Sequence, residues 1–135
     1  MSVFTPAEIE YLHSQRLARL ATTGLDCQPH VVPVSFRYNA EHDSIDIGGH
    51  DFAQRWKFRQ VQQNPKVAVV VDDLVSVDPW TPRAIEVRGE ASILGTGGKE
   101  IMPGFDDEMF RITPRQVVSW GVDAAMTFRS RRVGA

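Results

Sequence analysis

The chain has 135 residues and a formal net charge of −2, which argues against a general nucleic-acid binder because such proteins usually carry a basic excess. Its one cysteine, Cys27, excludes an internal disulfide and fits a reducing cytoplasm. The sequence has neither a signal-peptide pattern nor an apolar run of roughly 20 residues that would span a bilayer. We therefore expect one cytoplasmic domain over residues 1–135 that uses neither a membrane nor a nucleic acid.

The first part of the chain predicts a helix followed by three strands. Thr5 suits a helix cap and Glu8 completes a capping box, so a helix should run from Pro6 to about residue 16. Pro33 cannot donate a hydrogen bond within a sheet, so its strand should lie at an edge or contain a bulge. Apolar patterning between turn residues predicts strands at residues 17–23, 30–38 and 44–48.

A second helix is expected to follow these strands. Asp51 should cap it, with Gln54 at the capping-box position, and the helix should end before Pro65. Trp56 comes four residues after Phe52, a spacing that places both side chains on one helix face. We expect that face to be the buried one.

The second half of the chain predicts mainly strands. The apolar run 66–71 is too short for a helix and is typical of a buried strand. Gly89 indicates a bulge within its strand. Further strands are expected at 84–94 and 115–120, loops at 72–82 and 95–107, and an irregular tail at 122–135. Hairpin-length connections imply a mainly β (α+β) protein whose antiparallel sheet closes into a small barrel and so hides its edges.

Positive charge is concentrated in the segment 51–66, directly after Gly48, Gly49 and His50. A helix start presents free backbone N–H groups and a partial positive charge, so cations placed there favour an external anion such as a phosphate. The alternative is a solvated helix face, the usual explanation of a charge run. The cationic side chains of this segment are Arg55, Lys57, Arg59 and Lys66.

Four segments of the chain resemble one known family. They are LARLATTGLDCQPHVVPVSF (17–36), DIGGHDFAQRWKFRQVQQNPKVAVVVDD (46–73), IEVRGEA (85–91) and ITPRQVVSWG (112–121). Together they are similar to the split β-barrel flavin and deazaflavin reductases related to pyridoxamine phosphate oxidase, and specifically to the actinobacterial branch called PPOX-class F420-dependent oxidoreductases. The resemblance implies an antiparallel Greek-key barrel of six to seven strands with two or more short helices, of the FMN-binding split-barrel type.

The same resemblance implies a homodimer with a cofactor in a groove at the interface, touched by both subunits. Lys57 stands where the family places a cation that grips the cofactor phosphate, with Arg55 two residues before it. Trp80 is expected to reach the partner's cofactor, and Trp120 is a second candidate for that contact. The expected cofactor-binding residues are Pro33, Val34, Ser35, Gly48, Gly49, His50, Arg55, Lys57, Arg59 and Trp80.

The resemblance therefore implies hydride transfer between reduced coenzyme F420 and an electron-poor organic acceptor, such as an enone, a quinone or a similar C=C bond. FMN is the alternative cofactor because it also carries a phosphate on a ribityl chain. Arg59 and Lys66 favour F420, whose lactate and glutamate tail is anionic. A second alternative is a non-enzymatic protein that carries a flavin, a deazaflavin or a tetrapyrrole.

The sequence assigns no catalytic residue and no metal ligand. Ser35 and His50 can donate hydrogen bonds to a bound ring, although His50 equally suits a structural role at the entry to the helix. The acids Asp72 and Asp73 have no histidine or cysteine at metal-ligand spacing, so no metal is expected. The loop 95–111 leaves the substrate side of the site unpredicted.

Overall fold

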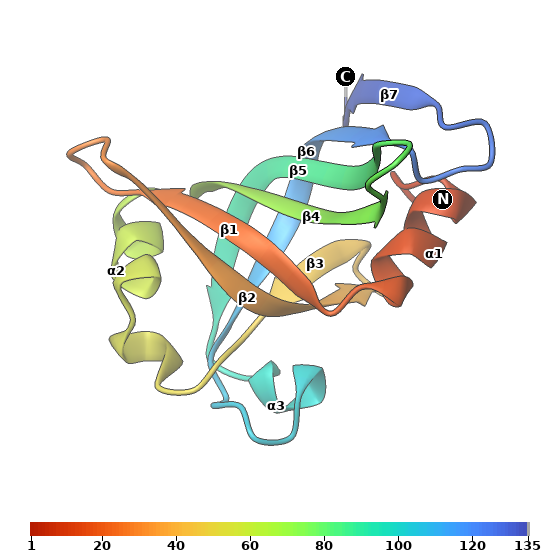
Figure 1. Cartoon of the computed structure of the whole chain (residues 1–135). Helices are drawn as coiled ribbons and strands as arrows, with labels where there is room; N and C mark the ends of the chain where they lie inside the picture. The colour runs from red at the N-terminus through yellow and green to blue at the C-terminus, as the bar shows by residue number, and fades with distance from the viewer. Residues whose placement is uncertain (135) are drawn as a thin grey trace.

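The computed structural model describes residues 1–134, of which just under half form β-strands (Figure 1). In chain order the elements are α1 (Pro6–Ser14), β1 (Leu17–Thr23), β2 (Pro29–Asn39), β3 (Ser44–Ile47), the 3₁₀ turn η1 (Phe52–Gln54), α2 (Trp56–Gln63), β4 (Lys66–Ser76), β5 (Thr81–Leu94), α3 (Gly98–Ile101), β6 (Met109–Trp120) and β7 (Phe128–Arg132).

The strands form a closed antiparallel barrel. Their order in the sheet is β3-β2-β1-β4-β5-β6-β7, and an additional pairing of β3 with β6 closes the first six strands into a ring. The run β4-β1-β2-β3 has the spatial order 4-1-2-3 of a Greek key. The predicted six- to seven-stranded Greek-key barrel is therefore confirmed, with β7 as an extra strand on the edge of β6.

Alternate residues of each strand point inward and fill the barrel with aliphatic and aromatic side chains. Phe110 of β6 lies in this core with its ring centroid 4.6 Å from that of Phe52 and 5.7 Å from that of Phe58. These contacts seat the η1–α2 segment against one end of the barrel, while α1 lies at the opposite end (Figure 1). The aliphatic residues in the same core include Leu20, Ile45, Ile47, Val69, Val71, Ile85, Val87, Ile112 and Val117.

The strand predictions differ from the structure mainly at the strand ends. The strand at 17–23 has the expected bounds, and the bulge at Gly89 appears as a register shift between Arg88 and Gly89. A Cβ atom on Gly89 would lie 2.2 Å from the carbonyl oxygen of Thr113, so only glycine fits the bulge. The loop expected at 72–82 is wrong at both ends, because β4 continues to Ser76 and β5 begins at Thr81; the two strands stay paired to these ends through a register shift between Leu74 and Ser76.

The tail expected to be irregular contains β7, which corrects that prediction within the described residues; Ala135 lies outside them. β7 is fixed by Arg131, whose guanidinium donates hydrogen bonds to the carboxylate of Glu8 and to the carbonyl oxygen of Val3. Glu8 is fully buried, and its carboxylate also accepts a hydrogen bond from the hydroxyl of Ser119. One carboxylate thus connects α1, β6 and β7.

The same carboxylate completes the predicted capping box of α1. The backbone N–H of Thr5 donates to Glu8 at 2.8 Å, and the Thr5 hydroxyl accepts from the Glu8 N–H at 3.2 Å. Burial raises the pKa of Glu8, but the hydrogen bonds from Arg131 and Ser119 outweigh burial and hold the pKa below its ordinary value of 4.5.

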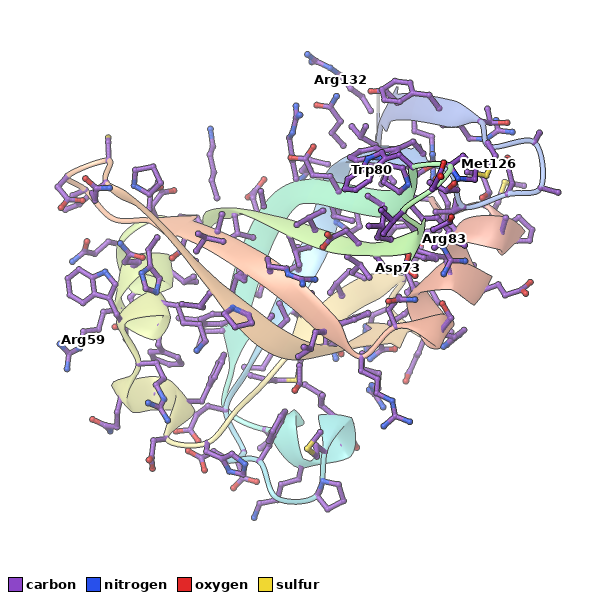
Figure 2. All side chains as sticks on the ribbon, viewed as in Figure 1. Arg59, Asp73, Trp80, Arg83, Met126 and Arg132 are labelled. Carbon is purple, nitrogen blue, oxygen red and sulfur yellow. The ribbon has the colours of Figure 1, made fainter. Side chains whose placement is uncertain are left out.

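The acids Asp72 and Asp73 form ion pairs with arginines on neighbouring strands. Asp73 lies beside Arg83 (Figure 2) and accepts two hydrogen bonds from it, with the shorter N···O distance at 2.7 Å. It accepts another from the Tyr11 hydroxyl at 2.8 Å. Asp72 accepts from Arg19 at 2.8 Å. These contacts join β1, β4, β5 and α1, and they give both acids a structural role.

No helix within residues 1–134 is both long and apolar enough to cross a bilayer.

We predict that Glu8→Gln lowers the free energy of unfolding at pH 7 by about 2 kcal/mol, because it removes the negative partner of Arg131, whose side chain is only partly exposed. A carboxyl group whose pKa is lowered by folding contributes stability above its ordinary pKa and loses that contribution as the pH falls through the lowered value. The difference between the wild type and Glu8→Gln should therefore shrink below pH 4.5. Urea unfolding at several pH values measures it.

The matched control is Glu10→Gln, an exposed position on the same helix, which should unfold like the wild type. Equal stability of the two glutamine variants at pH 7 would contradict the role given to Glu8.

Candidate cofactor site

A hollow of about 480 Å³ lies between β2, the turn after β3 and the start of α2. It brings together all of the expected cofactor-binding residues except Arg59 and Trp80. Its lining consists of His30, Val32, Pro33, Val34, Ser35, Gly48, Gly49, His50, Arg55, Trp56, Lys57 and Phe105. Segments that are separate in sequence thus converge on one place, which is the geometry that a binding site requires.

One side of the hollow is formed by the part of β2 that has a strand on one side only. Residues 29–35 pair with β1, whereas β3 joins β2 only from Phe36 onward. Pro33 lies in this single-sided part, which confirms its predicted position at an edge. Such an edge presents backbone N–H and C=O groups outward, and these are suited to a flat polar ligand.

The turn after β3 forms the opposite side and requires small residues. A Cβ atom on Gly48 would lie 3.0 Å from the Phe105 ring and 3.3 Å from the Ile101 side chain, so the glycine allows the α3 segment to approach. His50 packs edge-on against Phe105, with ring centroids 5.3 Å apart. His50 is exposed at the rim, and Phe105 is buried with 6% of its surface accessible.

The helix start differs from the predicted one. Asp51 has a left-handed backbone with φ of 51°, and the capping box that was expected from Asp51 and Gln54 is wrong. The residues after Asp51 form the separate turn η1, and α2 begins at Trp56 with Arg55 as its cap. Lys57 is consequently the second residue of α2, so the two cations lie closer to the free N–H groups of the helix start than the sequence predicted.

Lys57 is a partly buried cation in this hollow. Its ammonium nitrogen lies 5.5 Å from the centroid of the buried Phe52 ring. Burial lowers the pKa of Lys57, and the positive charge of Arg55 lowers it further. Within residues 1–134, neither cation forms an ion pair with a carboxylate, so both are available to an anion.

Arg55 is oriented by the turn that precedes it. Its Nε donates a hydrogen bond to the carbonyl oxygen of His50 at 3.1 Å. The guanidinium is thereby fixed beside Lys57 at the mouth of the hollow, and its remaining N–H groups are directed to solvent or to a ligand. A planar donor fork next to an ammonium group is a common arrangement for binding a phosphate.

Arg59 and Trp80 lie outside the hollow. Arg59 is exposed on the outer side of α2, and Trp80 lies in the β4–β5 turn at the other end of the barrel with 69% of its surface accessible (Figure 2). Trp120 lines a different hollow on the outer face of the sheet. Contacts of Trp80 and Trp120 with a partner's cofactor stay predictions, because they concern a second chain.

Two aromatic lining residues were missed. Trp56 was expected on the buried face of the helix, but 53% of its surface is accessible and it borders the hollow, which corrects the prediction. The buried face of α2 consists of Phe58, Gln60 and Val61, because the helix begins at Trp56 and so has a different rotation from the one assumed. Phe105 was not predicted because it lies in a glycine-rich segment with no periodic pattern. The one signal in the sequence was an aromatic residue standing alone in an expected loop.

The hollow combines an apolar surface, an exposed strand edge and a cationic end. It is suited to a planar ligand with an anionic group, and its aromatic members can pack against a ring. Residues 1–134 contain no group of three or more His, Cys, Asp or Glu side chains arranged to hold a metal ion.

Comparison with known proteins identifies the family. Residues 4–121 match the family model described as pyridoxamine 5′-phosphate oxidase. The chain belongs to this family. A relative in Streptomyces rimosus subsp. rimosus, named 5a,11a-dehydrotetracycline/5a,11a-dehydrooxytetracycline reductase, is 46% identical over 124 residues, which are 92% of this chain and 87% of the relative. The family and this relative are oxidoreductases by name, so oxidoreductase is the broad class of this chain.

Solved structures show the same fold at low sequence identity. A conserved hypothetical protein of Mycobacterium tuberculosis has a TM-score of 0.69 and 22% identity, over 99% of this chain and 94% of the other. An FMN-binding protein of Nostoc punctiforme related to pyridoxamine 5′-phosphate oxidase has a TM-score of 0.63 and 13% identity, over 98% and 99%. A heme-binding protein of Mycobacterium smegmatis has a TM-score of 0.69 and 13% identity, over 98% and 60%.

We predict that Lys57→Met stabilises the ligand-free protein by about 0.5–2 kcal/mol near neutral pH, because it removes a partly buried charge and its repulsion with Arg55. The folded-state pKa of Lys57 is lower than its ordinary value of 10.5. The destabilisation is therefore complete at neutral pH and is relieved as the pH rises through the lowered pKa. Thermal unfolding of both proteins between pH 7 and pH 11 measures the gap, which closes as the pH rises from the lowered pKa to the ordinary value of 10.5.

Lys66→Met is the control, because Lys66 is exposed at the start of β4, and its melting temperature should match that of the wild type. A lower melting temperature for Lys57→Met than for the wild type would show that Lys57 stabilises the fold. This result would contradict the prediction that its charge is unfavourable in the ligand-free protein.

Proposed function

We propose that this chain is an F420-dependent oxidoreductase that transfers a hydride from the reduced cofactor to an electron-poor C=C bond of an organic acceptor. The observation that carries the proposal is the pair of cations at the start of α2, Arg55 and Lys57. They have no carboxylate partner within residues 1–134. They lie beside the hollow, whose volume suits a ring. The family match and the 46% identical reductase support the oxidoreductase part of this proposal.

The residues of the hollow fit the parts of such a cofactor. Lys57, Arg55 and the free N–H groups of α2 would hold the phosphate. The edge of β2 at 33–35 and the turn 48–50 would flank the ring. When bound, the deazaflavin supplies the hydride, and the protein contributes position and exclusion of water. The Ser35 hydroxyl and backbone N–H groups of the β2 edge would stabilise negative charge that develops on an acceptor.

FMN is the competing cofactor, and one observation favours it: a structure of the same fold is an FMN-binding protein. The phosphate grip suits both cofactors. We prefer F420 because Arg59 lies one helical turn beyond Arg55 on α2 and is exposed to an anionic tail. A third candidate, a non-enzymatic tetrapyrrole carrier, has the fold-level support of the heme-binding protein.

Two observations support a proposal for the acceptor class: the name of the relative and the apolar part of the hollow. The Streptomyces rimosus relative is named for dehydrotetracycline compounds. Val32, Trp56 and Phe105 give the hollow here an apolar surface of the kind that a flat polycyclic compound requires. We infer that the acceptor is a polycyclic compound with a C=C bond conjugated to a carbonyl group.

We further propose that the chain functions as a homodimer through the outer face of the sheet. Val31 on this face has 65% of its surface accessible, and it lines a hollow of about 210 Å³ together with Val70 and Trp120. An apolar sheet face of this kind is suited to a second apolar surface. Pro33 and Ser35 share the outward face of β2 with Val31, so a second copy that covers Val31 would also border the cofactor site.

We predict that the apo-protein binds F420 more tightly than FMN, and that Lys57→Ala weakens the binding of either by roughly 10- to 150-fold, the effect of losing a charge-assisted hydrogen bond. Fluorescence titration measures both affinities.

The phosphate of FMN is terminal and gains a proton near pH 6, whereas that of F420 is a diester. Lowering the pH through about 6 should therefore weaken the phosphate contact of FMN and leave that of F420 unchanged.

Arg132→Ala, at an exposed cation on β7 that does not line the hollow, is the control for these titrations. Tight FMN binding with negligible F420 binding would reverse the choice of cofactor.

The reaction itself is tested by mixing the protein with reduced F420 and a dehydrotetracycline and following the oxidation of F420. Binding without any acceptor reduction, across a panel of enones and quinones, would favour the carrier alternative.

We predict that Val31→Lys converts the dimer to a monomer and weakens cofactor binding at least 10-fold, because it buries a charge at the proposed interface. Light scattering after gel filtration measures the mass, and fluorescence titration measures the affinity. Leu25→Lys at the exposed tip of the β1–β2 hairpin is the control. A wild-type protein that is monomeric while it binds the cofactor would exclude the shared site.

A further inference from the structure

The segment between β5 and β6 forms one wall of the cofactor hollow. It contains the short helix α3 and carries Phe105 into the lining. The segment is closed on itself, since the N–H of Gly98 donates to the carbonyl oxygen of Asp107 at 2.9 Å. A Cβ atom on Gly98 would lie 2.1 Å from the carbonyl oxygen of Asp106, so the two ends of this loop are in close contact. These contacts indicate a fixed wall.

Asp106 holds this wall to the turn that follows β3. Its backbone N–H donates to the carbonyl oxygen of Gly49 at 3.0 Å, and its carboxylate accepts from the backbone N–H of Phe52 at 3.1 Å. One residue thus bonds to both ends of the segment 49–52. The carboxylate also caps η1 by accepting its first N–H, the role that the sequence assigned to Asp51.

The turn held in this way is one that needs external support. Asp51 has a positive φ of 51°, a conformation that costs free energy for a residue other than glycine. The carbonyl oxygen of His50, within the same turn, accepts the hydrogen bond that orients Arg55. A shift of the turn would therefore move the guanidinium at the start of α2 as well as the Gly48–Gly49 side of the hollow.

We propose that Asp106 is a positioning residue for the cofactor. It acts through the turn 48–52: it fixes the backbone beside the ring, and through the His50 carbonyl it fixes Arg55 beside the phosphate. The same contact holds Phe105 against Gly48, so the wall and the phosphate site keep one relative position. This role rests on the proposed function, because it concerns the site in which that cofactor would bind.

The test uses three variants of the full chain: Asp106→Ala, Asp106→Asn and Asp107→Ala. Asp106→Ala should weaken F420 binding by about 10-fold, because a hydrogen bond to a charged group is lost from the geometry of the site. Asp106→Asn should bind nearly as the wild type, because the amide oxygen still accepts from Phe52. Asp107→Ala should also match the wild type, because the Asp107 carboxylate pairs with the exposed Lys99 at 3.6 Å.

A second measurement separates positioning from stability. Amide hydrogen exchange should accelerate at Phe52 in Asp106→Ala and be restored in Asp106→Asn, while exchange in the barrel core is unchanged. Equal F420 affinity of the wild type and Asp106→Ala would overturn the role of Asp106 and leave the proposed function intact. Failure of the wild type to bind either F420 or FMN would instead remove the proposed function and this role together.

Discussion

The short strand β3 is the constraint on which the architecture of the site depends. Its four residues are all buried and pair with β2 on one side, and three of them, Ile45, Asp46 and Ile47, also pair with β6 on the other. Its Asp46 is fixed by hydrogen bonds from Arg111 and Asn39, which hold a buried charge in place. Because β3 closes the barrel but ends at Ile47, the remainder of β2 keeps a free edge, and the chain turns away at Gly48. Closure of the barrel and formation of the hollow thus have one cause.

The charged groups that stabilise the fold differ from those that are available to a ligand. Most charged groups near the barrel are paired, as Asp73 is with Arg83 and Glu8 is with Arg131. Lys57 differs, because burial and a neighbouring cation make its charge unfavourable in the free protein. A group of this kind gains more from an incoming anion than a solvated lysine does, since the anion offsets a cost that folding has already imposed.

The sequence predicted the parts of this structure that local patterns determine. Alternation located the strands, Gly89 located a bulge, and Thr5 with Glu8 located a helix start. The start of α2 was wrong because its true geometry depends on Asp106, 54 residues from Phe52. β7 was missed because Arg131 gains its role from Glu8, 123 residues away. Neither contact leaves a local signal, whereas the motif around Lys57 is contiguous and could be recognised. The roles of Arg59 and Trp80 depend on a ligand and on a second chain, which one sequence does not contain.

The contact between Glu8 and Arg131 also bears on how the chain matures in the cell. Glu8 leaves the ribosome 123 residues ahead of Arg131, and domains generally fold as units during or after synthesis. The carboxylate of the first helix therefore has no arginine partner in the interior until β7 has emerged. A nascent chain arrested before β7 would expose this unfinished interior, so premature termination should yield a substrate for chaperones and proteases and not a smaller working barrel.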